Sequence, residues 1–198
     1  MNEVILKGYM KDIAPSHTIG GIEFDKAKLI VQRNTGVEDV VELKFKKLTN
    51  KYKENDLVFL KGNVRSYSYK VENNHNKVNI YVFTYFDVPE EDDSNKVLLE
   101  GRICKIDTLR KTKQGKNNIH FIVANNIVSE NSDKRLNSYI PCIAWGSLAK
   151  EISKLKVSDK VRVVGELHSR ECRKSTDDGD YQCWIAHEIF VKNIEVFE

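Results

Sequence analysis

The strongest constraint on the fold of this chain is that its sequence repeats itself. The segment VILKGYMKDI, residues 4–13, is matched 93 residues later by VLLEGRICKI, residues 97–106, with apolar residues and one glycine at the same places. A second pair, residues 53–69 and 156–172, is offset by 103 and aligns Gly62 with Gly165. Apolar residues alternate in the second pair, which indicates half-buried strands, and the glycine indicates a bend or bulge. The sequence therefore predicts two copies of one small β-domain.

The two copies are separated by an acidic segment. PEEDDSNK, residues 89–96, has one lysine against four acidic residues, a net charge of −3. Residues 1–88 have 14 basic against 11 acidic residues and residues 97–198 have 17 against 14, so each half carries +3. Proline and a run of like charges are typical of a linker. We therefore predict a divergent domain at 1–88, a linker at 89–96 and a second domain at 97–198, which suits a length of 198 residues.

Composition indicates a folded protein that does not enter a membrane. Hydrophobic residues make up 40% of the chain and charged residues 31%, which is enough apolar material for a core. No apolar run approaches the roughly 18 residues that span a bilayer, so we expect a cytoplasmic protein. The four cysteines lack the close spacing of a zinc site and are expected to be reduced. Whether Cys172 and Cys183 could approach each other is left open.

Each half contains five strand-like segments and one segment with a helical period. The helical period is clear at residues 146–155, where Leu148, Ile152 and Leu155 share a stripe, and weaker at residues 45–52. Three strands, a short helix and two strands is the order of an oligonucleotide-binding (OB) fold. We predict an all-β fold of two tandem five-stranded OB-fold barrels, each with a short helix between strands 3 and 4. The predicted strands are 3–13, 22–33, 39–45, 56–70 and 77–88, then 96–108, 118–128, 139–145, 160–173 and 181–197.

The fourth strand of the first half has a basic and aromatic outer face. The alternation that turns Val58, Leu60 and Val64 inward turns other side chains outward, namely Lys61, Arg65, Tyr67 and Tyr69. A binder of single-stranded nucleic acid needs cations for phosphates and aromatic faces on which bases stack. The equivalent outward positions of the second half keep the cations but lose the aromatics; they are Arg162, His168, Arg170 and Cys172. The alternative is that the tyrosines simply fill a strand and keep their hydroxyls hydrated.

The second half offers two further candidate contacts. Tyr139 and Trp145 lie six residues apart on one face of the third strand and could form a second stacking platform, although Trp145 could equally be a core residue at the barrel end. The loop at 109–118 could follow a phosphate backbone or be an ordinary solvated hairpin. Its four cations are Arg110, Lys111, Lys113 and Lys116. The DDG turn within residues 173–182 predicts a hairpin tip.

The sequence lacks recognisable catalytic motifs. The five histidines form no metal-binding cluster, and there is no Gly-rich phosphate loop and no GxSxG motif. Only His168 falls on the predicted binding face. We therefore predict no catalytic residue, no metal and no cofactor.

The second half resembles the bacterial single-stranded DNA-binding protein (SSB) family. The resemblance rests on three elements in order over about 100 residues, NKVLLEGRI at 95–103, IAWGSLAKEI at 143–152 and DKVRVVGELHSR at 159–170. It implies that bases stack at the positions of Trp145, Tyr139 and Cys172, of which the last has lost its aromatic ring. The first half matches only in outline. There Tyr69 aligns with Cys172 and Phe45 with Trp145, so the first half would supply the stacking group that the second half lost.

The resemblance also implies an assembly and raises a doubt about partners. Members of the family generally assemble four barrels, so two barrels per chain would make a homodimer. They usually end in a flexible tail with an acidic tip that recruits replication and repair enzymes, whereas this sequence ends at KNIEVFE, residues 192–198. We expect that replication or recombination proteins, if they bind, use another surface.

Three functional hypotheses follow from the sequence. The leading one is a non-enzymatic binder of single-stranded DNA, with RNA not excluded, that has little sequence preference and protects DNA in replication, recombination or repair. The second is an accessory module, similar to primosomal protein N, that mainly docks a helicase or recombinase. The third, an OB-barrel nuclease, would need clustered carboxylates and a metal, and the acidic residues of this chain are dispersed.

Overall fold

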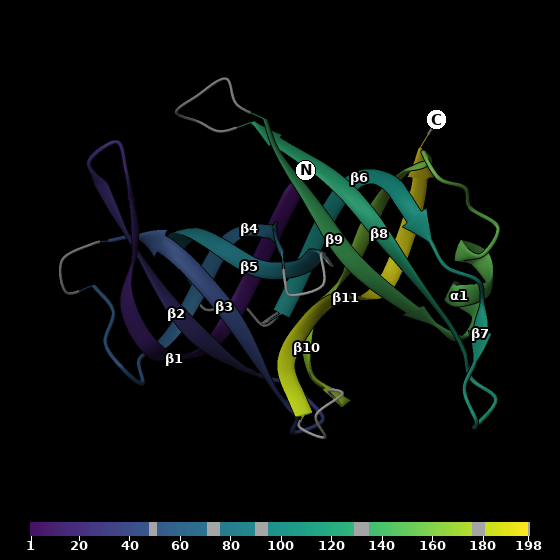
Figure 1. Ribbon diagram of the computed structural model, residues 1–198, viewed down its shortest axis with the longest axis horizontal. Coiled ribbons are helices and arrows are strands. Elements are labelled where there is room, and N and C mark those ends of the chain that lie inside the picture. The colour runs from purple at the N-terminus through teal and green to yellow at the C-terminus, as the bar shows by residue number, and fades with distance from the viewer. Residues whose placement is uncertain (48–50, 71–75, 90–94, 129–134, 176–180, 198) are drawn as a thin grey trace.

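A computed structural model of the chain describes residues 1–47, 51–70, 76–89, 95–128, 135–175 and 181–197. Nearly all of this part of the chain is β-structure (Figure 1). The strands of the first half are β1 (Asn2–Ile19), β2 (Ile22–Gln32), β3 (Glu38–Lys46), β4 (Leu57–Lys70) and β5 (Asn76–Asp87). The second half contains β6 (Asn95–Ile106), β7 (Arg110–Lys111), β8 (Asn117–Val128), β9 (Arg135–Trp145), α1 (Gly146–Ile152), β10 (Lys160–Ser175) and β11 (Tyr181–Phe197).

The strand pairings close into two rings, which we call barrel 1 and barrel 2. In barrel 1 the order around the ring is β1-β2-β3-β5-β4, and in barrel 2 it is β6-β8-β9-β11-β10. Among the described residues, β3–β5 and β9–β11 pair in parallel and the other contacts around each ring are antiparallel. Both rings contain the five strands predicted from the sequence, and the two-residue β7 adds to the edge of β8. The all-β OB-fold prediction is confirmed.

The two barrels are joined through their first strands, and the sequence repeat accounts for the join. β1 pairs antiparallel with β6, with Val4 opposite Val97. These two residues hold the same place in the repeat, so the strand pair has a pseudo-two-fold axis at its centre. On one side Asn2 lies opposite Leu99, and on the other Leu6 lies opposite Asn95. One continuous sheet, β5-β4-β1-β6-β10-β11, therefore runs through both halves (Figure 1).

An asparagine clamp on each side of this axis fixes strand register in the same way. The Asn2 side chain donates to the carbonyl oxygen of Val64 (2.7 Å) and accepts from its amide (2.9 Å). Asn95 makes the same two bonds to Leu167, at 3.0 and 2.9 Å. Both amides are thus satisfied where the strands enter the core, as buried polar groups require. Asn95 belongs to β6, so the last two residues of the predicted linker are strand residues.

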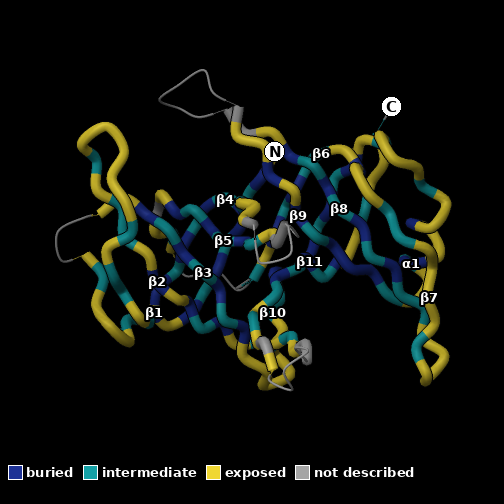
Figure 2. Tube along the Cα trace, in the orientation of Figure 1, coloured by how far each residue is buried: buried dark blue, intermediate teal, exposed yellow. Residues whose placement is uncertain are grey.

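The apolar residues of alternate strand positions fill the inside of both barrels. Figure 2 shows buried stretches along the strands and exposed loops at the ends of the molecule. In barrel 1 the core contains Leu6, Leu29, Leu43 and Leu60, and in barrel 2 it contains Leu99, Phe121, Ile140 and Val163, each almost fully buried. Val58, Leu60 and Val64 point inward as their alternation predicts. The outward faces of the same strands are left to contact solvent or a ligand.

The helix prediction is right for one half and wrong for the other. α1 covers residues 146–152 of the predicted 146–155, and its Ala149 and Ile152 are buried. In the first half Phe45 and Lys46 are instead the last residues of β3, because Val41, Leu43 and Phe45 continue the inward alternation. The described residues 47 and 51–53 are not helical, and residues 48–50 lie outside the described residues.

Two smaller sequence predictions concern loops and thiols. Ser175 pairs with Tyr181, so residues 173–182 bring two antiparallel strands together as expected, while the DDG turn itself lies outside the described residues. Cys172 lies opposite Trp184 and Arg173 opposite Cys183. Paired residues share a face and successive residues alternate, so Cys172 and Cys183 lie on opposite faces, and all four cysteines are free thiols. Among the helices in the described ranges, none is long and apolar enough to cross a membrane.

Candidate nucleic-acid interface

A groove lies between the two barrels, and barrel 2 supplies its aromatic side chains. The groove has a volume of about 760 Å³ and contains Trp145, His168 and Phe190 from β9, β10 and β11. The His168 and Phe190 rings stack with their centroids 5.0 Å apart. The hairpin of barrel 1 between β2 and β3, residues 32–35, forms another wall. Trp145 therefore sits in a site to which both barrels contribute, rather than in the core.

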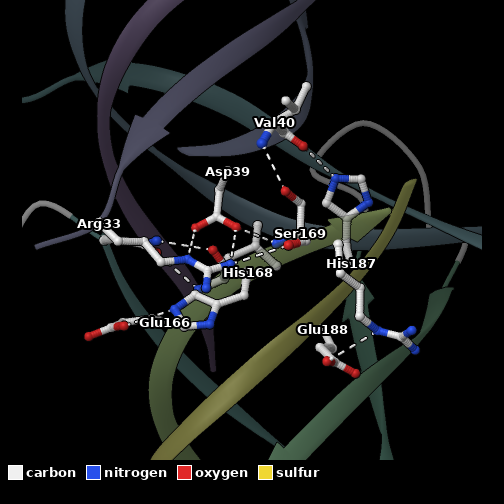
Figure 3. Close-up of polar contacts among 11 residues, drawn as sticks. Arg33, Asp39, Val40, Glu166, His168, Ser169, His187 and Glu188 are labelled. Atoms are coloured by element: carbon white, nitrogen blue, oxygen red, sulfur yellow. Dashed lines mark hydrogen bonds and ion pairs between the residues drawn. The ribbon is translucent and has the colours of Figure 1, made fainter. Parts of the chain in front are cut away.

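A buried ion pair anchors that hairpin against barrel 2. The Arg33 guanidinium donates from Nε and Nη2 to the two carboxylate oxygens of Asp39, at 2.6 and 2.5 Å. The Asp39 side chain is fully buried and also accepts from the Ser169 amide of barrel 2. Burial raises the pKa of Asp39, but the hydrogen bonds from Arg33 and Ser169 outweigh it and leave the pKa below its usual value. Figure 3 shows the cluster of Arg33, Asp39 and Ser169, which we call the Asp39 latch.

The latch has a neutral counterpart on the other side of the pseudo-two-fold axis. Ser169 Oγ accepts from the Val40 amide (2.9 Å), and Ser66 Oγ accepts from the Tyr139 amide (2.7 Å). The Ser66 amide donates to Ser138 Oγ at 3.4 Å, and this bond is equivalent to the one from the Ser169 amide to Asp39. Each barrel is thus hydrogen-bonded through a serine to the third strand of the other barrel, β3 or β9. The Tyr139 backbone lies at this junction, and its side chain is 45% exposed.

Two histidines lie near the latch in Figure 3. His187 Nε2 lies 2.7 Å from the Val40 carbonyl oxygen, which can only accept, so Nε2 carries the hydrogen. His168 contacts Glu166 at 2.9 Å. Burial lowers the pKa of His168 and the Glu166 carboxylate opposes this shift, with burial the stronger effect. At neutral pH, His168 therefore offers the groove a neutral ring.

The cations on the outward face of barrel 2 are paired with carboxylates. Arg170 Nε lies 3.5 Å from Glu188, and Lys192 Nζ lies 3.3 Å from Glu166. Arg162, on the same strand as Arg170, contacts Glu100 at 2.7 Å. These are partly exposed pairs and contribute little to stability. They do reduce the positive charge that barrel 2 presents to an anion.

The outward face of barrel 1 combines aromatic rings with cations that stack on them. Tyr67 contacts Tyr69 and Tyr81 with ring centroids 6.0 and 5.8 Å apart. Lys44 Nζ lies over both Tyr67 (4.7 Å) and Tyr81 (4.4 Å). The Arg65 guanidinium lies 4.1 Å from the centroid of Phe83. We call these six residues, from β3, β4 and β5, the barrel 1 aromatic face.

The structure places most of the predicted contact residues on the surface, in separate groups. Tyr67 and Tyr69 are 40% and 42% exposed. Lys61 points outward but is paired with Glu3 at 2.7 Å. The four loop cations extend from β7 into an exposed hairpin around Gly115 that is closed by hydrogen bonds between Thr112 and Lys116. The loop cations lie at the far end of barrel 2 from barrel 1 (Figure 1).

The predicted role of Phe45 is not compatible with its position. Phe45 is 5% exposed and packs edge-on against Tyr52, with centroids 5.3 Å apart. In the β3–β5 pair of barrel 1, Leu43 lies opposite Val82, and in the equivalent β9–β11 pair of barrel 2, Cys142 lies opposite Ile189. This register aligns Phe45 with the buried Ala144, and Lys46 with Trp145. The alignment of Phe45 with Trp145 that the sequence predicts is therefore wrong by one residue, and a shift of one residue exchanges the two faces of a strand.

Sequence reasoning missed half of the barrel 1 aromatic face. Lys44, Tyr81 and Phe83 were not among the predicted contact residues. The signal was present in β5, where the aromatic residues at 81, 83 and 85 alternate with the buried Ile80, Val82 and Thr84. Lys44 carries no such signal, because only the parallel pairing of β3 with β5 brings it over the tyrosines. In the described part of the chain, no group of three or more His, Cys, Asp or Glu side chains is placed to hold a metal ion.

The comparison with known families decides the affiliation of the chain. The sequence pattern of the single-strand binding protein family matches residues 94–197, which is more than half of the chain and covers barrel 2. The chain belongs to the single-strand binding protein family. A search of curated proteins finds no match.

Solved structures extend the similarity of this single-strand binding family member to both barrels. The wild-type single-stranded DNA binding protein of Thermus aquaticus matches with a TM-score of 0.73 and 20% identity, covering 100% of this chain and 93% of that chain. A deletion mutant of the same Thermus aquaticus protein matches with a TM-score of 0.71 and 20% identity, covering 100% of this chain and 95% of that chain. These similarities show that barrel 1, although outside the matched family pattern, is part of the same fold.

Proposed function

We propose that this protein binds single-stranded DNA with little sequence preference and protects it during replication, recombination or repair. The observation that carries the proposal is the barrel 1 aromatic face, where exposed tyrosines lie beside Lys44 and Arg65. Aromatic faces stack on any base, and cations follow the phosphates. Membership of the single-strand binding protein family and the likeness to a single-stranded DNA binding protein support it. The role is one of binding in the cytoplasm, without catalysis, metal or cofactor.

The proposed contacts fall into two classes. The stacking residues are Tyr67, Tyr69, Tyr139 and Trp145. Cations on the barrel faces and in the hairpin that includes β7 make the phosphate contacts, and His168 is a neutral neighbour in the groove. These cations are Lys44, Lys61, Arg65, Arg170, Arg110, Lys111, Lys113 and Lys116.

A titration with oligo-dT tests the function. Trp184→Phe protein, in which Trp145 is the remaining tryptophan, should lose fluorescence as dT binds. The logarithm of the binding constant should fall with the logarithm of salt concentration, with a slope of roughly −3 if about four phosphates are neutralised. A matched titration with oligo-rU compares RNA with DNA. Absence of both quenching and a salt slope would exclude the proposed function and favour a protein-docking module.

We propose further that two chains associate so that four barrels are brought together. The support is that this chain places two barrels side by side through β1 and β6, so that two chains give the four barrels that the family resemblance implies. Light scattering should therefore give a mass of twice the 22.9 kDa chain. A mass of one chain, independent of protein concentration and of added dT, would contradict the dimer.

A further inference from the structure

We infer that the two barrels divide the work of binding, and that barrel 1, which lies outside the matched family pattern, carries most of the base stacking. The inference rests on the proposed function and concerns which surface performs it. Barrel 2 then contributes mainly through its loops, Tyr139 and the groove around Trp145. The two outward faces differ at equivalent positions.

The glycines and serines that both halves share fix which positions are equivalent. β4 and β10 correspond with an offset of 103, which aligns Ser66 with Ser169. These two serines each accept a hydrogen bond from a backbone amide of the opposite barrel. In β5 and β11 the offset is 107, because Gly62 approaches the carbonyl of Phe83 as Gly165 approaches that of Phe190. In β3 and β9 it is 99, which aligns Lys44 with Ile143.

At these equivalent positions, aromatic contacts in barrel 1 are replaced by an ion pair in barrel 2. Tyr67 corresponds to Arg170 and Tyr81 to Glu188. The contact of two rings with centroids 5.8 Å apart thus becomes an Arg–Glu pair at 3.5 Å. Tyr69 corresponds to Cys172, which has no ring itself and lies opposite Trp184 of β11 on the same face. One aromatic position is retained, since Phe83 corresponds to Phe190, and it is covered by Arg65 in barrel 1 and by His168 in barrel 2.

The cations differ between the barrels in the same direction. Among the described residues, neither Lys44 nor Arg65 has a carboxylate within ion-pair distance, and their ring contacts hold them in place. Glu42, the neighbouring acidic residue on β3, accepts instead from Asn79, which also donates to the Tyr67 hydroxyl. In barrel 2, Arg170 and Lys192 are already paired with Glu188 and Glu166. A phosphate gains more from an unpaired cation than from one that must first leave a carboxylate.

Access favours the barrel 1 tyrosines over Trp145, although Tyr139 of barrel 2 is as exposed as they are. Tyr67 and Tyr69 are 40% and 42% exposed, their rings contact each other, and Lys44 lies over Tyr67. A base can therefore stack on them without moving other parts of the protein. Trp145 is less exposed and lies in a groove that also contains the Arg33 hairpin. Partial burial also lowers the pKa of Lys44, and the Glu42 carboxylate opposes this shift only in part.

The stacking part of the inference is tested with single substitutions and a labelled dT oligonucleotide, with binding followed by anisotropy. Tyr67→Leu should weaken binding at least roughly fivefold, and Tyr67→Leu/Tyr69→Leu roughly 25-fold or more, because each lost stack is worth at least fivefold. Trp145→Leu should weaken it less than Tyr67→Leu, although tryptophan offers the larger ring. A loss for Trp145→Leu that equals or exceeds that of Tyr67→Leu overturns the inference.

The charge part is tested with a matched pair of lysines that both lie over aromatic rings. Lys44 lies over Tyr67 and Tyr81 and has no ion-pair partner in the described part of the chain. Lys192 lies over Phe190 at 4.7 Å and is paired with Glu166. Lys44→Gln should reduce the steepness of the salt dependence by about 0.7, the value for one phosphate on a single strand. Lys192→Gln should leave it unchanged. Equal changes in both variants, or a larger one for Lys192→Gln, contradict the inference.

Two controls separate the possible failures. Urea unfolding of each variant should show an unchanged midpoint, because all the substituted side chains lie on outward faces. If the wild-type protein does not bind dT, the proposed function fails. If wild-type protein binds dT and Trp145→Leu alone abolishes binding, the function stands and the division between the barrels fails.

Discussion

Replacing Gly101 with alanine is expected to lower the free energy of unfolding by about 3 kcal/mol, at the upper end of the usual range for overpacking. Gly101 is the glycine of the repeated segment in β6. An added Cβ would lie well inside van der Waals distance of the Ala124 carbonyl oxygen and 2.6 Å from Val123 Cγ1. The backbone of β8 cannot move away without breaking its pairing with β6 and β9. Urea unfolding measured by circular dichroism would give the change in free energy.

The pseudo-symmetry supplies a replicate of this experiment, and a surface glycine supplies its control. At Gly8, the equivalent residue of barrel 1, an added Cβ would meet the Ile30 carbonyl and lie 2.9 Å from Leu29 Cγ, so Gly8→Ala should have a similar effect. At Gly115 no atom of the described residues lies within 4 Å of an added Cβ, but φ is +80°. Gly115→Ala should therefore cost only about 1 kcal/mol from backbone strain. Equal effects at Gly101 and Gly115 would show that close approach of the strands is not the reason for the repeated glycine.

This glycine also shows why the fold could be predicted from the sequence. A small barrel requires its first strand to pass close to the second, and only glycine permits that approach. The same requirement in both halves places a glycine at the same point of VILKGYMKDI and VLLEGRICKI. Alternating apolar residues set the remaining strands, so the prediction of five strands in each half needed only local information.

The candidate site was less predictable because its pairings are not local. Tyr67 and Tyr69 could be placed outward from the alternation within β4, and Tyr139 and Trp145 from that within β9. The error at Phe45 arose between strands, where an offset of 99 rather than 100 relates β3 to β9, and one residue exchanges inside for outside. Lys44 reaches the tyrosines across a parallel strand pair that no periodicity reveals.

The junction between the barrels was not predictable at all. The Asp39 latch joins residues 130 positions apart, Asp39 and Ser169. Its chemistry also differs on the two sides of the pseudo-two-fold axis, since the position equivalent to Asp39 is Ser138. Neither residue stands out in the sequence, because a single acidic residue at the start of a strand is ordinarily exposed. Here it is fully buried and carries the contact between the Arg33 hairpin and β10.

Replacing Asp39 with alanine is expected to lower the free energy of unfolding by about 3 kcal/mol, because it removes the carboxylate that faces the Arg33 charge and leaves Arg33 Nε and the Ser169 amide without their acceptor. The value lies at the low end of the range for buried pairs, since the Arg33 side chain is 24% exposed. Ser138→Ala is the matched control. It removes a neutral contact of 3.4 Å at the equivalent position and should cost no more than about 1 kcal/mol.

The pH dependence of stability distinguishes the charge of Asp39 from its shape. The pKa of Asp39 in the folded protein is lower than its ordinary value of about 3.9, so its contribution is complete above that pH and is lost as the pH falls through the folded-state pKa. Asp39→Asn keeps the shape of the side chain but has no carboxylate to protonate. The stability difference between wild type and Asp39→Asn should therefore be constant near neutral pH and shrink below about pH 4. A difference that stays constant down to about pH 2 would mean that the ionised carboxylate is not what holds the Arg33 hairpin against barrel 2.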